Sequence, residues 1–201
     1  MTTGFSRADL LRRGAVGGGA LLVSASGLTA FADAASAGTI PDADLAYLRL
    51  LIAAELLALD FQDRALASGK LRHDAHPVVR KLRADEKAHY TKLASLMTAA
   101  GQTPATSDDI DFSYPRRSFH GQTAILRFAR QIERLALGAY LGAVENVETP
   151  ELRLPIGQIA ANEAQHAGAL AELAGGAMIG RAFAPALQMG EVSNALDRFE
   201  S

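Results

Sequence analysis

The pattern of apolar and polar positions along the chain predicts four long helices. Apolar residues recur at helical spacing in four segments, and polar or glycine-containing stretches separate them. Gly69 and Gly101 each follow such a segment, and Pro150 precedes another, as expected at helix ends and starts. The predicted helices cover residues 41–68, 77–100, 123–147 and 150–173.

The lengths of the connections predict how these helices are joined. Residues 70–75 and the Thr149-Pro150 pair form short turns, which make two helical hairpins. Residues 102–120 are polar and rich in proline, serine and aspartate. An extended chain of that length reaches about 60 Å, whereas a helix of about 25 residues measures roughly 37 Å. This stretch can therefore return along the bundle as a crossover.

Two further features concern single positions and the tail. Pro155 is expected to mark an early turn or a bend in the fourth helix, because proline removes a backbone donor. The tail 181–201 is expected to hold one short helix over 192–199. The resulting fold class is all-α, a four-helix bundle with a short C-terminal helix.

Composition supports a helical domain and narrows its chemistry. Of the 201 residues, 49 % are hydrophobic and only 6 % aromatic, which favours packed helices over a β-sandwich. The formal net charge is −2 and no basic block occurs, so nucleic-acid binding has no electrostatic support. The sequence contains no cysteine. Thiolate zinc sites, iron–sulfur clusters and disulfides are therefore excluded, and any metal must be held by oxygen and imidazole.

The beginning of the chain is predicted to be an export signal over 1–37, followed by the bundle domain over 38–201. A polar start with three arginines precedes a weakly apolar run over 14–31. Small-x-small sequences at 32–34 and 35–37 then resemble cleavage sites. A retained membrane anchor is the alternative, because the run is about long enough to span a bilayer.

The start of this segment resembles a twin-arginine export signal. Residues 6–11, Ser-Arg-Ala-Asp-Leu-Leu, match the core motif of that signal with alanine in place of the second arginine. Arg12 and Arg13 supply a displaced pair. The resemblance implies export of an already folded protein to the periplasm, the cell envelope or the outside. A metal could then be loaded in the cytoplasm.

One short pattern occurs twice in the predicted helices and carries most of the candidate chemistry. A Glu-x-x-His sequence lies in the second and in the fourth helix. A further glutamate precedes the first copy by 31 residues and the second copy by 30. A Glu and a Glu-x-x-His, repeated in two hairpins, form the ligand set of a carboxylate-bridged two-metal site in a bundle. The candidate ligands are Glu55, Glu86, His89, Glu133, Glu163 and His166.

Each of the four glutamates lies within an apolar helical stripe. Its neighbours three, four and seven residues away are mostly leucine, isoleucine, valine or alanine. A buried carboxylate without a partner costs several kcal/mol, and four together repel one another. Two divalent cations would balance the four negative charges, and two neutral histidines would complete the shell. Surface residues or isolated buried ion pairs are the alternative interpretation.

Other candidates are weaker. His73 and His76 lie in a predicted turn, where solvation is expected, and His120 precedes the third helix. Tyr140 either belongs to the core alone or reaches the metals, because a buried phenol needs one hydrogen-bond partner. Asp85, next to Glu86, either supports a ligand or faces solvent.

The sequences that begin at Glu133 and Ile159 resemble the second half of the exported ferritin-like proteins, which include the desiccation-related ferritin-like group. The resemblance covers residues 41–175, and the exported ferritin-like proteins are part of the wider ferritin and rubrerythrin superfamily. It implies a ferritin-like bundle with a two-iron centre that reacts with oxygen or peroxide. It also implies that the six candidate residues are the ligands, with Glu86 and Glu163 as bridges.

Three functions are therefore expected from the sequence. The first is an exported di-iron protein that oxidises iron or handles O2 or H2O2, as a ferroxidase or peroxidase type of oxidoreductase. The second is a non-catalytic envelope or stress scaffold. The third resembles a manganese catalase, because oxygen and imidazole ligands suit manganese as well as iron. The expected partners are metal ions with O2 or H2O2, a membrane only through the signal segment, and a second copy in a homodimer.

Overall fold

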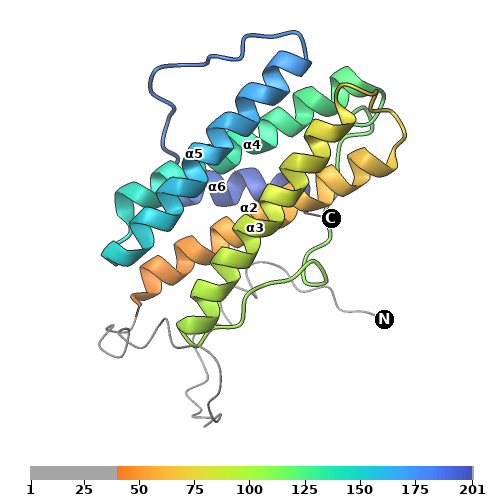
Figure 1. Cartoon of the computed structure of the whole chain (residues 1–201). Helices are drawn as coiled ribbons and strands as arrows, with labels where there is room; N and C mark the ends of the chain where they lie inside the picture. The colour runs from red at the N-terminus through yellow and green to blue at the C-terminus, as the bar shows by residue number, and fades with distance from the viewer. Residues whose placement is uncertain (1–39, 201) are drawn as a thin grey trace, which may run out of the picture.

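The computed structural model describes residues 40–200, and the predicted export signal over 1–37 lies outside this range (Figure 1). Its secondary structure is helical, apart from one isolated β-bridge between Phe112 and Glu200. No helix within 40–200 combines the length and hydropathy that a bilayer span requires. The helices are α2 (Asp42–Ala67), α3 (His76–Ala99), α4 (Gln122–Asn146), α5 (Pro150–Leu173), α6 (Met189–Leu196) and the 3-10 helix η1 (Asp197–Phe199).

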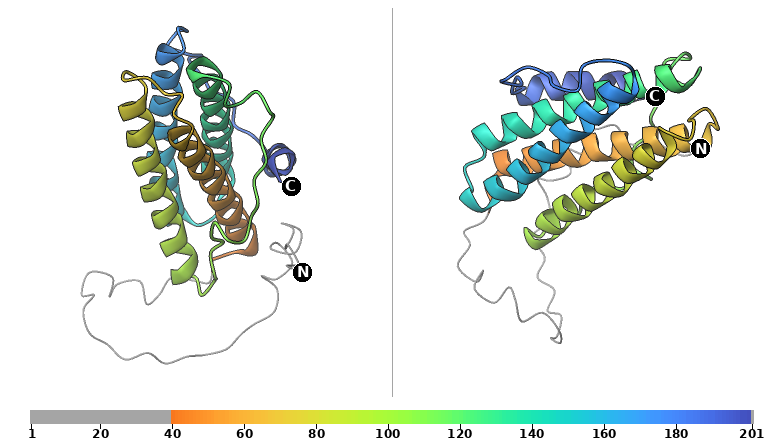
Figure 2. Two further views of the ribbon diagram at one scale, coloured as in Figure 1. Left: turned by 90° about the vertical axis from the view of Figure 1, so that its right-hand side faces the viewer. Right: turned by 45° about the horizontal axis from the view of Figure 1, so that its top comes forward.

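The four long helices form a bundle made of two hairpins. Helix α2 packs against α3 and α4, and α4 packs against α5, whereas α3 and α5 touch only sparsely (Figures 1 and 2). The segment between α3 and α4 runs along the length of the bundle (Figure 2). The predicted all-α four-helix bundle, with two hairpins, a long crossover and a short C-terminal helix, is confirmed.

The helix ends follow the glycine signals in the sequence. Gly69, Gly101 and Gly175 have φ values of 64°, 72° and 76°, a left-handed conformation that ends α2, α3 and α5. The four predicted helices agree with the observed bounds to within one residue. Pro155 lies inside α5 without interrupting it. Its missing N–H frees only a carbonyl in the exposed first turn, where water can hydrate it.

The crossover is anchored to the bundle by its own side chains. Ile110 and Phe112 are buried, and the Tyr114 hydroxyl donates a hydrogen bond to Asp60 Oδ2 at 2.7 Å. The Arg64 guanidinium donates to the carbonyl of Phe112 at 3.0 Å. This long connection therefore has one defined path along α2.

The C-terminal segment packs closely on α4 before α6 begins. Leu187 N–H donates to the Gly138 carbonyl at 2.9 Å, and a Cβ on Gly142 would lie 2.0 Å from the Leu187 oxygen. Helix α6 then lies against α2 and α4 on the outside of the bundle (Figure 2). It begins three residues earlier than the predicted start at 192, because Gln188 and Glu191 form a capping box there.

Candidate metal centre

The bundle brings all six candidate ligands together in its interior. Each of the four long helices contributes, α3 and α5 with the Glu-x-x-His pairs and α2 and α4 with one glutamate each. The glutamates are at most 1 % exposed, and His89 and His166 are 8 % and 3 % exposed. The predicted location of these residues is therefore correct, whereas ligation itself stays a prediction. The residues are Glu55, Glu86, His89, Glu133, Glu163 and His166.

These residues form two overlapping groups of donor atoms. Within each group, one donor atom from every residue lies within 4.8 Å of the others. Glu86 and Glu163 belong to both groups, which is the arrangement that two carboxylate bridges between neighbouring metal ions require. The first group adds Glu55 and His89 to this shared pair, and the second adds Glu133 and His166.

In the first group, one ring nitrogen faces three carboxylates. His89 Nδ1 lies 2.9 Å from Glu163 Oε1, 3.1 Å from Glu86 Oε2 and 3.7 Å from Glu55 Oε2. A ring nitrogen carries at most one hydrogen and cannot donate to all three oxygens at once. Donor atoms that converge in this way from three helices suit a cation better than a proton.

The second group repeats this arrangement around the other histidine. His166 Nδ1 lies 2.9 Å from Glu86 Oε1, 3.4 Å from Glu133 Oε2 and 3.8 Å from Glu163 Oε2. The two imidazole rings stack with their centroids 5.8 Å apart, so the two groups lie side by side.

The outer nitrogen of each imidazole has a separate acceptor. His89 Nε2 lies 3.0 Å from Asn162 Oδ1, and His166 Nε2 lies 3.4 Å from Asp85 Oδ2. Lys81 in turn donates to Asp85. These acceptors hold the hydrogen on Nε2 and leave Nδ1 for a metal ion or a second proton. Asp85 thus supports a candidate ligand, one of the two roles considered from the sequence.

Several buried polar atoms of the cluster make no hydrogen bond of proper geometry among the described residues, although some lie close to another polar atom of the cluster. A buried polar atom without a partner costs about 1–3 kcal/mol, so such a concentration calls for an explanation. All of these atoms belong to the two donor groups, and a cation would serve each of them. The residues present therefore fit a metal centre. The atoms are Glu55 Oε2, Glu133 Oε2, Glu163 Oε1, Glu163 Oε2 and His166 Nδ1.

Burial gives the carboxylates unusual proton affinities. It raises the pKa of Glu55, Glu133 and Glu163, and the neighbouring charge of Glu86 raises the pKa of each further. Burial also acts to raise the pKa of Glu86, but close contacts with the imidazoles of His166 and His89 outweigh it and hold that pKa well below its usual range.

The histidines respond in the opposite direction. Burial acts to lower the pKa of His89, but contacts with Glu163, Glu55 and Glu86 raise it to about 12. For His166, contacts with Glu133 and Glu86 outweigh burial and raise the pKa to about 10. Without metal the cluster therefore holds protons that balance the carboxylates, and a metal ion has to displace them.

Tyr140 and Gln62 complete the hydrogen bonding of the cluster. The Tyr140 hydroxyl is buried and donates to Glu55 Oε1, so this residue both belongs to the core and contacts a candidate ligand. Gln62 Nε2 donates to Glu133 Oε1 at 3.0 Å and lies 3.5 Å from Glu86 Oε1. Gln62 is not among the residues predicted from the sequence, although it lies seven residues after Glu55 on the same helix face.

The remaining histidines lie apart from the cluster. His73, His76 and His120 are all exposed, as the sequence predicts for the first two. A pocket of about 450 Å³ does reach His89 and Asn162 from the side where α3 and α5 face each other. It provides a path by which a small molecule can approach one edge of the cluster.

Comparison with known proteins agrees with this fold and site. A family model described as "Ferritin-like domain" matches residues 43–176, a range that contains the four long helices almost entirely and all six candidate ligands. A search of the curated proteins finds no match. The matched range covers about two thirds of the 201 residues. The chain therefore belongs to the ferritin-like domain family.

Proposed function

We propose that the buried cluster binds two divalent metal ions, iron in the first place, and that the protein oxidises iron or reduces oxygen or peroxide. The observation that carries this proposal is the pair of donor groups that share Glu86 and Glu163. When bound, two ferrous ions supply two electrons for the reduction of a small oxidant.

The proposal gives each side chain a defined part. Glu55 and His89 would hold one ion, Glu133 and His166 would hold the other, and the two shared glutamates would bridge them. The charge balance supports this assignment, because four carboxylates and two dications sum to zero. Four further residues support the ligands. Asn162 and Asp85 orient the imidazoles of His89 and His166. Tyr140 donates a hydrogen bond to Glu55, and Gln62 donates one to Glu133.

The substrate and the cellular location that we propose are those expected from the sequence. A small oxidant, O2 or H2O2, suits the pocket beside His89, which is lined by polar side chains such as Lys92 and Gln158. We further propose that the protein works outside the cytoplasm after export by the twin-arginine route. Oxygen and imidazole donors also suit manganese, so a catalase-like dimanganese centre is the second metal assignment to test.

The decisive test is an anaerobic titration with Fe(II), followed by exposure to oxygen. We expect two ions per chain and, after oxygen, the near-ultraviolet absorbance of a coupled ferric pair. Glu133→Gln with Glu163→Gln should abolish the absorbance, because each donor group loses a carboxylate. Glu172→Gln, an exposed residue of the same helix as Glu163, is the matched control and should behave like the natural protein.

Two other outcomes have distinct meanings. Fewer than two ions per chain, with an increase in stability for the double variant, would contradict the proposal and favour a non-catalytic scaffold. Two manganese ions per chain in protein isolated from its natural compartment, with peroxide disproportionation, would instead assign the catalase-like function.

A further inference from the structure

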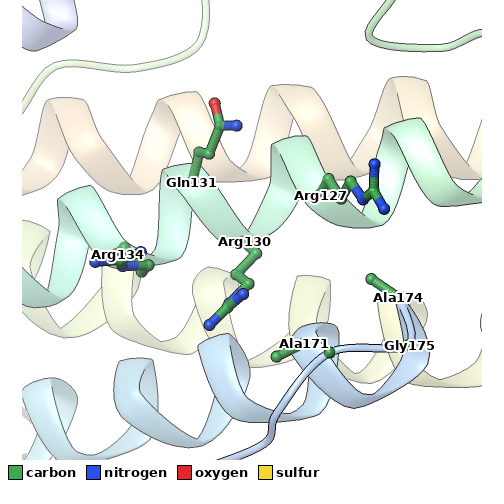
Figure 3. A pocket seen from close by; sticks show the side chains of 8 residues that line it. Arg127, Arg130, Gln131, Arg134, Ala171, Ala174 and Gly175 are labelled. Atoms are coloured by element: carbon green, nitrogen blue, oxygen red, sulfur yellow. The ribbon is translucent and has the colours of Figure 1, made fainter. Parts of the chain in front are cut away.

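Three arginines on successive turns of α4 line a second pocket, away from the metal cluster. Arg127, Arg130 and Arg134 line a cavity of about 390 Å³ together with the C-terminal end of α5, and Arg130 extends from α4 toward α5 (Figure 3). None of the residues that line this cavity is acidic. The rest of its lining consists of Gln131, Ala171, Ala174, Gly175 and Gly176.

The three pocket arginines have no anionic partner within residues 40–200. Arg64 pairs with Asp60 at 2.9 Å, and Arg83 pairs with Asp63 at 2.5 Å. No such ion pair or hydrogen bond links any of the three pocket arginines to another described residue. Their charges therefore add up over one small surface.

Arg130 is the most constrained of the three. It extends from α4 toward Ala171 on α5, and its Nε is buried without a hydrogen-bond partner among the described residues (Figure 3). Its Nη1 lies 4.0 Å from where a Cβ on Gly176 would be. A buried guanidinium N–H without an acceptor is costly, and no contact among the described residues offsets that cost at Arg130.

The end of α5 does not supply that acceptor. A helix C-terminus attracts cations, which explains in part why arginines gather there. Two of its last carbonyls nevertheless accept hydrogen bonds in the turn that ends the helix. Gly175 N–H donates to the Glu172 carbonyl at 2.9 Å, and Gly176 N–H donates to the Ala171 carbonyl at 2.8 Å.

We propose that this pocket binds a phosphate group. Guanidinium forks match the oxygens of a phosphate in pairs, and three of them surround a cavity that contains no competing carboxylate. Gly175 and Gly176 have no side chains, so a phosphate and its substituent can approach the arginines closely. The site is separate from the metal centre and does not depend on its function.

The phosphate can belong to a free anion or to a lipid headgroup. Ile179 and Phe183 follow Gly176 closely in the chain and are 88 % and 91 % exposed. A lipid-borne phosphate would bring acyl chains near these two side chains, whereas a free phosphate would not use them. The two sources therefore predict different effects of replacing Ile179 and Phe183.

The test measures binding of inorganic phosphate by calorimetry, and binding of phosphatidylglycerol vesicles by co-sedimentation, with phosphatidylcholine vesicles as reference. We expect Arg130→Gln with Arg134→Gln to weaken phosphate binding at least about tenfold, because two charge-assisted contacts are lost. Arg116→Gln with Arg117→Gln removes the same charge from exposed crossover positions and should leave binding unchanged. Circular dichroism and metal content confirm that each variant is folded.

Each outcome is decisive. Loss of both phosphate and vesicle binding in the pocket variant alone supports the site. If Ile179→Ser with Phe183→Ser then loses vesicle binding, the phosphate belongs to a lipid headgroup. If that variant binds inorganic phosphate as the natural protein does, and the natural protein does not prefer phosphatidylglycerol vesicles, the ligand is a free anion. The proposal is wrong if the natural protein binds neither probe, or if the pocket and crossover variants lose binding equally.

Discussion

Each histidine of the metal cluster has two ring nitrogens with different surroundings. Nδ1 faces carboxylate oxygens in the interior, while Nε2 meets an outer acceptor, Asn162 for His89 and Asp85 for His166. The outer acceptor fixes the orientation of the ring and so decides which nitrogen is free to bind metal. At the scale of single residues, these acceptors contribute to the proposed centre by orienting its imidazoles.

The change Asn162→Ala tests this role. The His89 ring loses the acceptor that orients it, so metal affinity should fall about 10- to 100-fold while the bundle stays folded. Competition with a chelator of known affinity measures the change. Gln165→Ala removes a neighbouring exposed side chain that lines the same pocket, and its affinity should equal that of the natural protein. Equal losses in both variants would contradict the role assigned to Asn162.

At the scale of the helices, the buried carboxylate of Asp44 links the start of α2 to the turn that precedes α5. Asp44 accepts backbone hydrogen bonds from Glu148 at 2.9 Å and from Thr149 at 2.8 Å. Burial acts to raise the pKa of Asp44, but hydrogen bonds from Thr149 and Glu148 outweigh it and lower that pKa. A lowered pKa in the folded state means that ionised Asp44 stabilises the fold.

This stabilisation has a defined pH range. It is present above the unfolded pKa of about 4 and is lost as the pH falls through the lower folded pKa. Asp44→Asn should therefore cost about 1–3 kcal/mol of unfolding free energy at pH 7 and less at pH 3. Urea unfolding at both pH values measures this difference. Asp42→Asn, at an exposed first-turn position two residues earlier, loses only an interaction with the helix dipole and should cost clearly less at pH 7.

A second contact between elements depends on two glycines of α4. Gly138 and Gly142 leave room for the C-terminal segment, because a Cβ on Gly138 would meet the Leu187 side chain and a Cβ on Gly142 would meet the Leu187 backbone. Gly142→Ala would place a methyl group 2.0 Å from the Leu187 oxygen, so the C-terminal segment must move away. The expected loss of stability is about 1–3 kcal/mol.

The matched control is another helical glycine with room for a methyl group. The nearest atom to a Cβ on Gly157 is a Val144 methyl carbon at 4.0 Å. Gly157→Ala should therefore stabilise the protein by about 0.5–1 kcal/mol, through helix propensity alone. Thermal unfolding measures both changes. A Gly142→Ala variant as stable as the natural protein would show that the C-terminal segment does not pack there.

At the scale of the whole molecule, the sequence predicted the bundle and the position of the candidate ligands well. Helical periodicity, with Gly69 and Gly101 at the ends, is a local signal and located the helices closely. A glutamate in an apolar stripe, such as Glu55, is also visible without a structure. Both signals lie within single helices, which explains their success.

Features that depend on contacts between helices were not predicted. Gln62 and Asn162 become partners of the cluster only when α2, α4, α3 and α5 are placed together. The contact of Gly142 with the C-terminal segment joins positions 45 residues apart in sequence, and α4 alone gives no sign of it. The three pocket arginines look like an ordinary solvated face until the end of α5 is seen opposite them (Figure 3).

The central claim is that this ferritin-like bundle holds two metal ions bridged by Glu86 and Glu163. Anomalous diffraction at the iron edge, from crystals of protein loaded anaerobically with Fe(II), tests it most directly. The account predicts two peaks about 3.5–4 Å apart inside the bundle, one beside His89 and one beside His166, with both shared glutamates between them. A single peak, or peaks only at exposed carboxylates, would contradict it.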